Sequence, residues 1–107
     1  MARNYRLIAV RVKRHLNQRP RTLLRDLARK LKADRHTISK VLIASYGLSF
    51  RALQRDLIKR KAIRFLHKKD LLGKEIAAKI GYVAPESLTR FVKKATGKTP
   101  TQLRRGD

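Results

Sequence analysis

The chain carries one pattern twice, as DLARKL at residues 26–31 and as EIAAKI at residues 75–80, an offset of 49 positions. Beyond the turn that follows each copy, the match continues at an offset of 50 positions and pairs residues 37–40 (TISK) with residues 87–90 (SLTR). The second copy therefore has one extra residue in its turn. Because each copy has the pattern of a short helix, a tight turn and a second helix, the sequence predicts two related helical units.

Apolar residues outside the repeat also recur at helical spacing. Ile8, Val12 and Leu16 predict a first helix that ends before the loop containing Pro20, and a long helix is predicted from about Ser49 to His67. Strand patterns are nearly absent. We therefore expect an all-α chain with a first helix-turn-helix subdomain at residues 1–48, a linker helix at 49–67 and a second helix-turn-helix subdomain at 68–107.

Capping residues mark the ends of several predicted helices. Thr22 and Asp34 are the candidate N-caps of the second and third helices. Gly47 and Gly97 follow the second helix of each unit, where a glycine is typical of a helix end. Thr99 followed by a proline predicts the start of a last helical turn.

The charge of the chain restricts its partners. Its 107 residues include 29 Lys and Arg against 7 Asp and Glu, a formal net charge of +22. Such an excess repels itself and predicts a polyanionic partner. The chain has no cysteine, so disulfides and thiolate metal sites are excluded. Since His15, His36 and His67 lack a ligand spacing with one another, we expect neither a metal nor another cofactor.

The N-terminal sequence MARNYRLIAVRVKRH lacks the apolar core and cleavage site of a signal peptide. The longest uncharged stretch, residues 41–50, is too short to span a bilayer. We therefore expect a cytoplasmic protein that does not act at a membrane.

A helix-turn-helix unit reads DNA with the outer face of its second helix, whose N-terminal residues reach base edges in the major groove. Ala28 and Ala77 provide the small side chain that lets the two helices of each unit pack closely. Helical spacing places Arg35, His36, Ser39 and Lys40 on the outer face in the first unit, and Pro85, Glu86, Thr89 and Arg90 in the second.

The chemistry of these side chains suits base recognition. Lys40 and Arg90 can donate to guanine, and Ser39 and Thr89 are adaptable hydrogen-bonding groups. Glu86 can accept from cytosine, or it can instead stabilise the N-terminus of its own helix through the helix dipole. Both roles of Glu86 stay open at this point.

The sequence resembles the DNA-binding domain of the AraC/XylS family of bacterial transcription regulators over nearly its whole length. The resemblance is carried by Glu75-Ile76-Ala77, Gly81-Tyr82, Ser87–Phe91, Gly97–Pro100 and Arg104, with weaker counterparts at Asp34-Arg35, Thr37–Lys40 and Gly47–Phe50. The resemblance implies seven helices and major-groove contacts from both units. Carried over position by position, these contacts fall on His36, Ser39, Lys40, Glu86, Thr89 and Arg90.

The chain departs from the family pattern at a few positions. Lys32 stands where the family usually has glycine, Gly73 where it has a large apolar residue, and Ile58 where it has arginine. An aromatic residue is common in the family where this chain has Leu42 and Leu88. None of these departures removes the motif.

Most basic residues are expected to meet phosphates, since phosphate contacts outnumber base contacts. From their positions at helix ends, the candidates are Arg6, Lys13, Arg21, Thr22, Arg35, Arg51, Arg55, Lys74 and Lys93. A linker helix of about 19 residues is roughly 28 Å long, which suits reading of two adjacent major-groove segments. We expect the chain to bind double-stranded DNA as a monomer, unless it is joined to a further domain, with RNA polymerase as a candidate second partner.

Three other functions are less well supported. An enzyme is disfavoured because the chain has no Gly-rich phosphate loop, no nucleophile elbow and no close acid pair. The alternative binding function is that of an RNA-binding or ribosome-associated basic protein, which the charge alone would fit. It predicts exposed aromatics or a sheet, and the sequence shows neither. A membrane-active cationic helix would need one wide apolar face, whereas these helices have narrow apolar stripes and their own caps.

Overall fold

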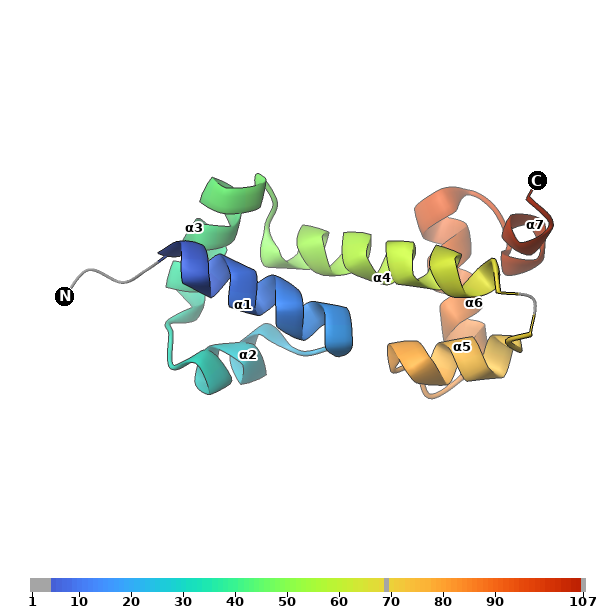
Figure 1. Cartoon of the computed structure of the whole chain (residues 1–107), viewed down its shortest axis with the longest axis horizontal. Coiled ribbons are helices and arrows are strands. Elements are labelled where there is room, and N and C mark those ends of the chain that lie inside the picture. The colour runs from blue at the N-terminus through green and yellow to red at the C-terminus, as the bar shows by residue number, and fades with distance from the viewer. Residues whose placement is uncertain (1–4, 69, 107) are drawn as a thin grey trace. The chain divides into compact units, whose positions relative to one another are not determined.

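The computed structural model describes residues 5–68 and 70–106, and within these residues it contains seven helices and no strand (Figure 1). In chain order the helices are α1 (Tyr5–Gln18), α2 (Leu24–Leu31), α3 (Arg35–Tyr46), α4 (Phe50–Leu66), α5 (Gly73–Ile80), α6 (Pro85–Thr96) and α7 (Pro100–Arg105). The predicted all-α fold with two helix-turn-helix motifs, α2–α3 and α5–α6, is confirmed.

The chain forms two compact units, the first ending at Asp56 and the second beginning at Leu57. The boundary lies inside α4, which runs without a break from one unit into the other. The three-part division of the chain at 48/49 and 67/68 stays a prediction.

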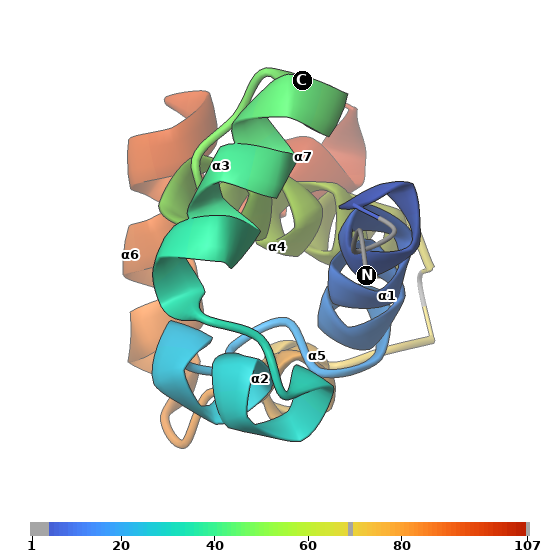
Figure 2. The ribbon, with the colours of Figure 1, turned by 90° about the vertical axis from the view of Figure 1, so that its left-hand side faces the viewer.

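The first unit has its core where α1, α2 and α3 meet the beginning of α4 (Figure 2). Helix α3 contacts both α1 and α2. The apolar positions of each helix recur every three or four residues, so one stripe of each faces inward. The buried side chains of this unit include Val12, Leu16, Leu27, Ile38, Val41, Leu42, Phe50 and Leu53.

The second unit repeats this arrangement with α4, α5 and α6. Tyr82 lies at the edge of its core, with its ring centroid 6.4 Å from that of Phe91. Ile58 is buried in this core, so its departure from the family pattern places an apolar side chain in an apolar site. The buried members of the core are Ile58, Ala62, Leu66, Ile76, Ala77, Ile80, Leu88 and Val92.

The loop between α1 and α2 is held by a side chain of α4. Gln54 Nε2 donates to the carbonyl oxygens of Pro20 and Thr22, at 2.8 Å each. These two bonds tie the entrance of the first helix-turn-helix motif to the start of α4.

The second unit has the same tie at the equivalent position. Arg104 on α7 donates to the carbonyl oxygens of Lys68 (3.1 Å) and Leu71 (2.7 Å), which lie in the loop between α4 and α5. Arg104 follows Gln54 by 50 positions, the offset of the sequence repeat. The repeat therefore extends beyond the two motifs, because α4 closes the first unit as α7 closes the second.

Most of the predicted helix caps are confirmed. The Asp34 side chain accepts a hydrogen bond from the N–H of His36 at 2.6 Å and begins α3. Gly47 and Gly97 end α3 and α6 in the left-handed conformation, with φ of 70° and 77°. Thr99 caps α7, with its hydroxyl accepting from the N–H of Gln102 at 3.2 Å.

The N-cap predicted at Thr22 is wrong. Helix α2 begins one residue later, at an N-cap formed by Leu23, which makes no side-chain capping bond. The Thr22 hydroxyl instead donates to the carbonyl of Arg19 at 2.8 Å. A capping side chain must point to the helix it begins, and this one is used to close the preceding loop.

Lys32 occupies a backbone conformation that favours glycine. It ends α2 with φ of 53°, and among the described residues it is the one non-glycine with a positive φ. Its counterpart in the second unit, Gly81, has φ of 111°. In this region the Cβ atom crowds the following carbonyl, at a cost of roughly 1–2 kcal/mol. The family preference for glycine at this position thus has a conformational cause.

We expect Lys32→Gly to raise the free energy of unfolding by about 0.5–1 kcal/mol, because part of the relieved strain is offset by the greater chain entropy of glycine. Urea denaturation at fixed pH and salt measures the change. The matched control is Lys32→Ala, which removes the charge and keeps the Cβ. If both variants gained the same stability, charge repulsion rather than backbone strain would be the cause.

Candidate nucleic-acid interface

The buried face of α3 determines which of its side chains point outward. Ile38, Val41 and Leu42 are at most 3% exposed and pack inside the first unit. At 100° per residue, the opposite side of the helix carries the three predicted readers of this unit. Of these, His36 and Lys40 are exposed and Ser39 is half-buried. The structure therefore brings all three to one accessible face.

Helix α6 repeats this geometry in the second unit. It has 12 residues, as α3 does, and it buries Leu88 and Val92. The predicted readers Glu86, Thr89 and Arg90 are all exposed. Each unit thus has the same three positions of its second helix on an accessible face.

One hydrogen bond and one helix position bear on the predicted readers of α6. The Thr89 hydroxyl donates to the carbonyl of Pro85 at 3.3 Å, so its oxygen lone pairs stay free to accept. Glu86 lies in the first turn of α6, where a carboxylate favours the helix dipole. Exposure also leaves it able to reach a base, so both roles of Glu86 fit the structure.

Sequence reasoning missed two exposed apolar residues at this interface. Ile43 is 57% exposed and lies on the outward face of α3. Val83, the extra residue of the second turn, is 101% exposed and lies two residues before the start of α6. The repeat could have indicated that Ile43 is exposed. The offset of 50 pairs it with Lys93, and a lysine at the equivalent position indicates a surface position.

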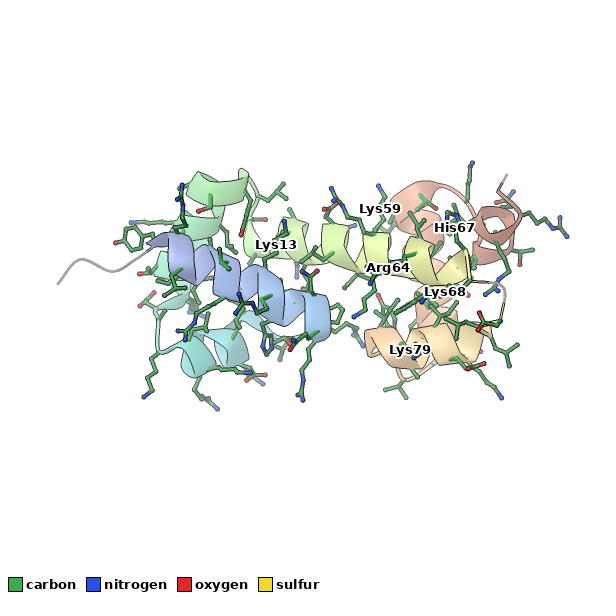
Figure 3. All side chains as sticks on the ribbon, viewed as in Figure 1. Lys13, Lys59, Arg64, His67, Lys68 and Lys79 are labelled. Carbon is green, nitrogen blue, oxygen red and sulfur yellow. The ribbon has the colours of Figure 1, made fainter. Side chains whose placement is uncertain are left out.

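The predicted phosphate contacts are exposed, with one exception. Figure 3 shows long basic side chains extending from the helices of both units, with Lys13 labelled on α1. Lys13 also lies 5.1 Å above the ring of Tyr46, at the end of α3.

A groove of about 470 Å³ between α1 and this end of α3 is lined by residues that include Arg6 and Tyr46. The exposed candidates are Arg6, Lys13, Arg21, Arg35, Arg51, Arg55, Lys74 and Lys93.

Thr22 is the exception, because its side chain is engaged within the protein. Besides donating to Arg19, its oxygen lies 3.0 Å from Nε2 of His15. Burial lowers the pKa of His15, and the positive charges of Lys30 and Arg19 lower it further. His15 and Thr22 thus form part of the packing between α1 and the loop before α2.

Like charges lie close together in the second unit as well. Burial lowers the pKa of Lys61, and the neighbouring charges of Arg64 and Lys79 lower it further. Figure 3 shows Arg64 on α4 and Lys79 on α5, across from each other. Such repulsion within the protein would be relieved by a polyanion.

The described residues contain no group of three His, Cys, Asp or Glu side chains that could hold a metal ion. In the same part of the chain, none of the helices has the length and apolar character needed to cross a membrane.

A family model described as a helix-turn-helix domain, of the AraC type, matches residues 27–106. The chain belongs to this family. A search of curated protein sequences found no match. Several solved structures share the fold over nearly the whole chain.

The C-terminal domain of AraT, a response regulator from Geobacillus stearothermophilus, is 26% identical, with 96% of this chain and 84% of that chain covered and a TM-score of 0.80. The C-terminal domain of the two-component response regulator yesN from Fusobacterium nucleatum is 22% identical, with 95% and 99% covered and a TM-score of 0.79. The DNA-binding domain of the global transcriptional factor AdpA, solved with a target DNA, is 18% identical, with 98% and 93% covered and a TM-score of 0.76.

Membership of the AraC-type family assigns the function in outline. The chain is a sequence-specific DNA-binding domain of a transcription regulator, and its partner is double-stranded DNA. An RNA-binding role is not favoured.

Proposed function

We propose that α3 and α6 are two reading helices that enter adjacent major-groove segments of one duplex. The observation that carries this proposal is the match between the two helices. Both have 12 residues, and both bury two equivalent apolar positions, Ile38 and Leu88, and Leu42 and Val92. Both also carry polar side chains at the same three outward positions of their first two turns, where Ser39 is half-buried and the other five are exposed. The N-terminal part of such a helix is the part that reaches base edges.

The proposed base contacts follow from the donors and acceptors on these faces. Lys40 and Arg90 donate to the O6 and N7 atoms of guanine. His36 donates or accepts according to its tautomer, and Ser39 and Thr89 accept or donate through their hydroxyls. Glu86 accepts from cytosine N4 or stabilises the start of α6.

The proposed phosphate contacts are the eight basic residues of the predicted set, all of them exposed: Arg6, Lys13, Arg21, Arg35, Arg51, Arg55, Lys74 and Lys93. Thr22 is left out because its hydroxyl is used within the first unit. Arg51 and Arg55 are one turn apart on α4, so they lie on one side of that helix.

The proposed mode of action is binding alone, without catalysis, by one molecule on an asymmetric site. Both reading helices belong to one chain, so a single molecule supplies two readers. RNA polymerase is the proposed second partner of the regulator. The proposed place of action is the bacterial cytoplasm, where the chromosome lies.

The proposed phosphate contacts predict a strong dependence of binding on salt. If about eight phosphates are neutralised, log affinity should fall against log salt concentration with a slope of roughly −7. Fluorescence anisotropy of a labelled mixed-sequence DNA duplex between 50 and 300 mM NaCl measures the slope. A slope near zero would rule out a phosphate-anchored complex.

Two further binding experiments, selection from a random DNA pool and comparison with RNA, separate this function from its alternative. Selection of one preferred duplex from a random pool, with tighter binding to that DNA than to an RNA duplex of the same sequence, is expected of major-groove readers. Equal or tighter binding to RNA would instead favour the ribosome-associated alternative.

A further inference from the structure

Ile43 is an apolar side chain in line with the polar reading face of α3, one turn beyond Ser39. It is 57% exposed. At 100° per residue, its direction around α3 differs by about 20° from that of His36 and by about 40° from that of Ser39. A large aliphatic side chain therefore points to the same partner as the proposed readers.

The rest of the first unit leaves Ile43 largely uncovered, since it is 57% exposed. A groove of about 270 Å³ between the start of α1 and α3 is lined by Tyr5 and by Thr37, Lys40, Val41 and Ala44 of α3, and Ile43 is not among its lining residues. In a DNA complex Ile43 would therefore be shielded from water by the duplex.

The major groove offers one apolar group to such a side chain, the C5 methyl of thymine. We propose that Ile43 is a specificity-determining residue that contacts a thymine methyl in the half-site of the first unit. This inference rests on the proposed reading role of α3. Ile43 lies seven residues beyond His36, about 10 Å along the helix axis. If α3 lies along the groove, the thymine is about three base pairs from the base that His36 contacts.

The second unit is not expected to prefer a thymine at the equivalent position. The position equivalent to Ile43 on α6 is Lys93, which carries a charge suited to phosphate. The two half-sites should therefore differ, with a methyl-dependent thymine in the first and none at the matching position of the second.

The test replaces thymines of the selected site by deoxyuridine, which lacks the methyl group and keeps every hydrogen-bonding atom. The half-site of the first unit is the one whose preference changes in Lys40→Ala. Within this half-site, replacing one particular thymine by deoxyuridine should weaken wild-type binding by about fourfold, which is the loss of affinity expected when one buried methyl group is removed. The same replacement should change the affinity of Ile43→Ala by less than about 1.5-fold. Val10→Ala, at an exposed apolar residue of α1 (40% exposed), is the matched control and should behave as the wild type.

The results separate failure of the Ile43 contact from failure of the reading role of α3. If no deoxyuridine weakens wild-type binding, or if one weakens Ile43→Ala equally, the thymine contact of Ile43 is overturned. If Lys40→Ala changes no half-site, the reading role of α3 fails, and this is seen before any deoxyuridine is introduced.

Discussion

Arg90→Ala is expected to relax the sequence preference at one base pair of the site and to lower affinity for that site by about 1–3 kcal/mol, or about 5- to 150-fold. The side chain is exposed on the outward face of α6, so its loss removes the proposed donor to guanine without opening a core. Lys40→Ala should have the same effect at one base pair of the other half-site, through α3.

Binding-site selection with each variant, followed by affinity measurements on single-base changes, measures both effects. Arg55→Ala is the matched control, because it removes one exposed charge from α4 and should weaken all sequences alike, with a salt slope reduced by about one. If Arg90→Ala selected the wild-type motif unchanged, its assignment as a reader would be wrong.

An alanine inserted after Asp56 is expected to abolish one half of the selected motif. The insertion lies at the boundary between the two units, within the continuous helix α4. It rotates everything that follows by about 100° and adds about 1.5 Å. Since three base contacts of at least about 1 kcal/mol each would be lost, affinity for the full site should fall by more than about 100-fold.

Footprinting on the preferred site measures this loss, and circular dichroism checks that the variant stays helical. The matched control is Asp56→Ala, which introduces an alanine at the same place without changing the phase of α4. Protection of both groove segments by the insertion variant would mean that α4 does not set the phase of the two readers.

Much of the fold could be predicted from the sequence because its signals are local. The spacing of apolar residues located the first six helices, and Thr99 followed by a proline located the seventh. The cores hold residues that the pattern placed inside, such as Leu27, Ile38 and Ile76. The caps at Asp34 and Gly47 were also predictable, since each depends on a residue type next to a helix end.

Contacts between distant segments were not predictable. Thr22 has the residue type and position of an N-cap, yet its hydroxyl bonds to the preceding loop, a choice that depends on where α1 ends. The side-chain bonds of Gln54 join it to a loop more than 30 residues away, and no periodicity reports such a contact.

The reading faces could be predicted only in part. The repeat placed His36 and Glu86 at equivalent positions, and both are exposed. Ile43 was missed because an apolar residue in an amphipathic helix predicts burial. In the structure α3 turns Ile38 and Leu42 toward the core, and this leaves Ile43 on the exposed side of the helix.

Selection of binding sites from a pool of random duplexes by the wild-type protein tests the central proposal most directly. Two reading helices on one chain predict an asymmetric motif of two short segments, whose centres are about 10 base pairs apart, one turn of the duplex. A motif with a single segment, or no enriched motif at all, would contradict the proposal that α3 and α6 both read bases.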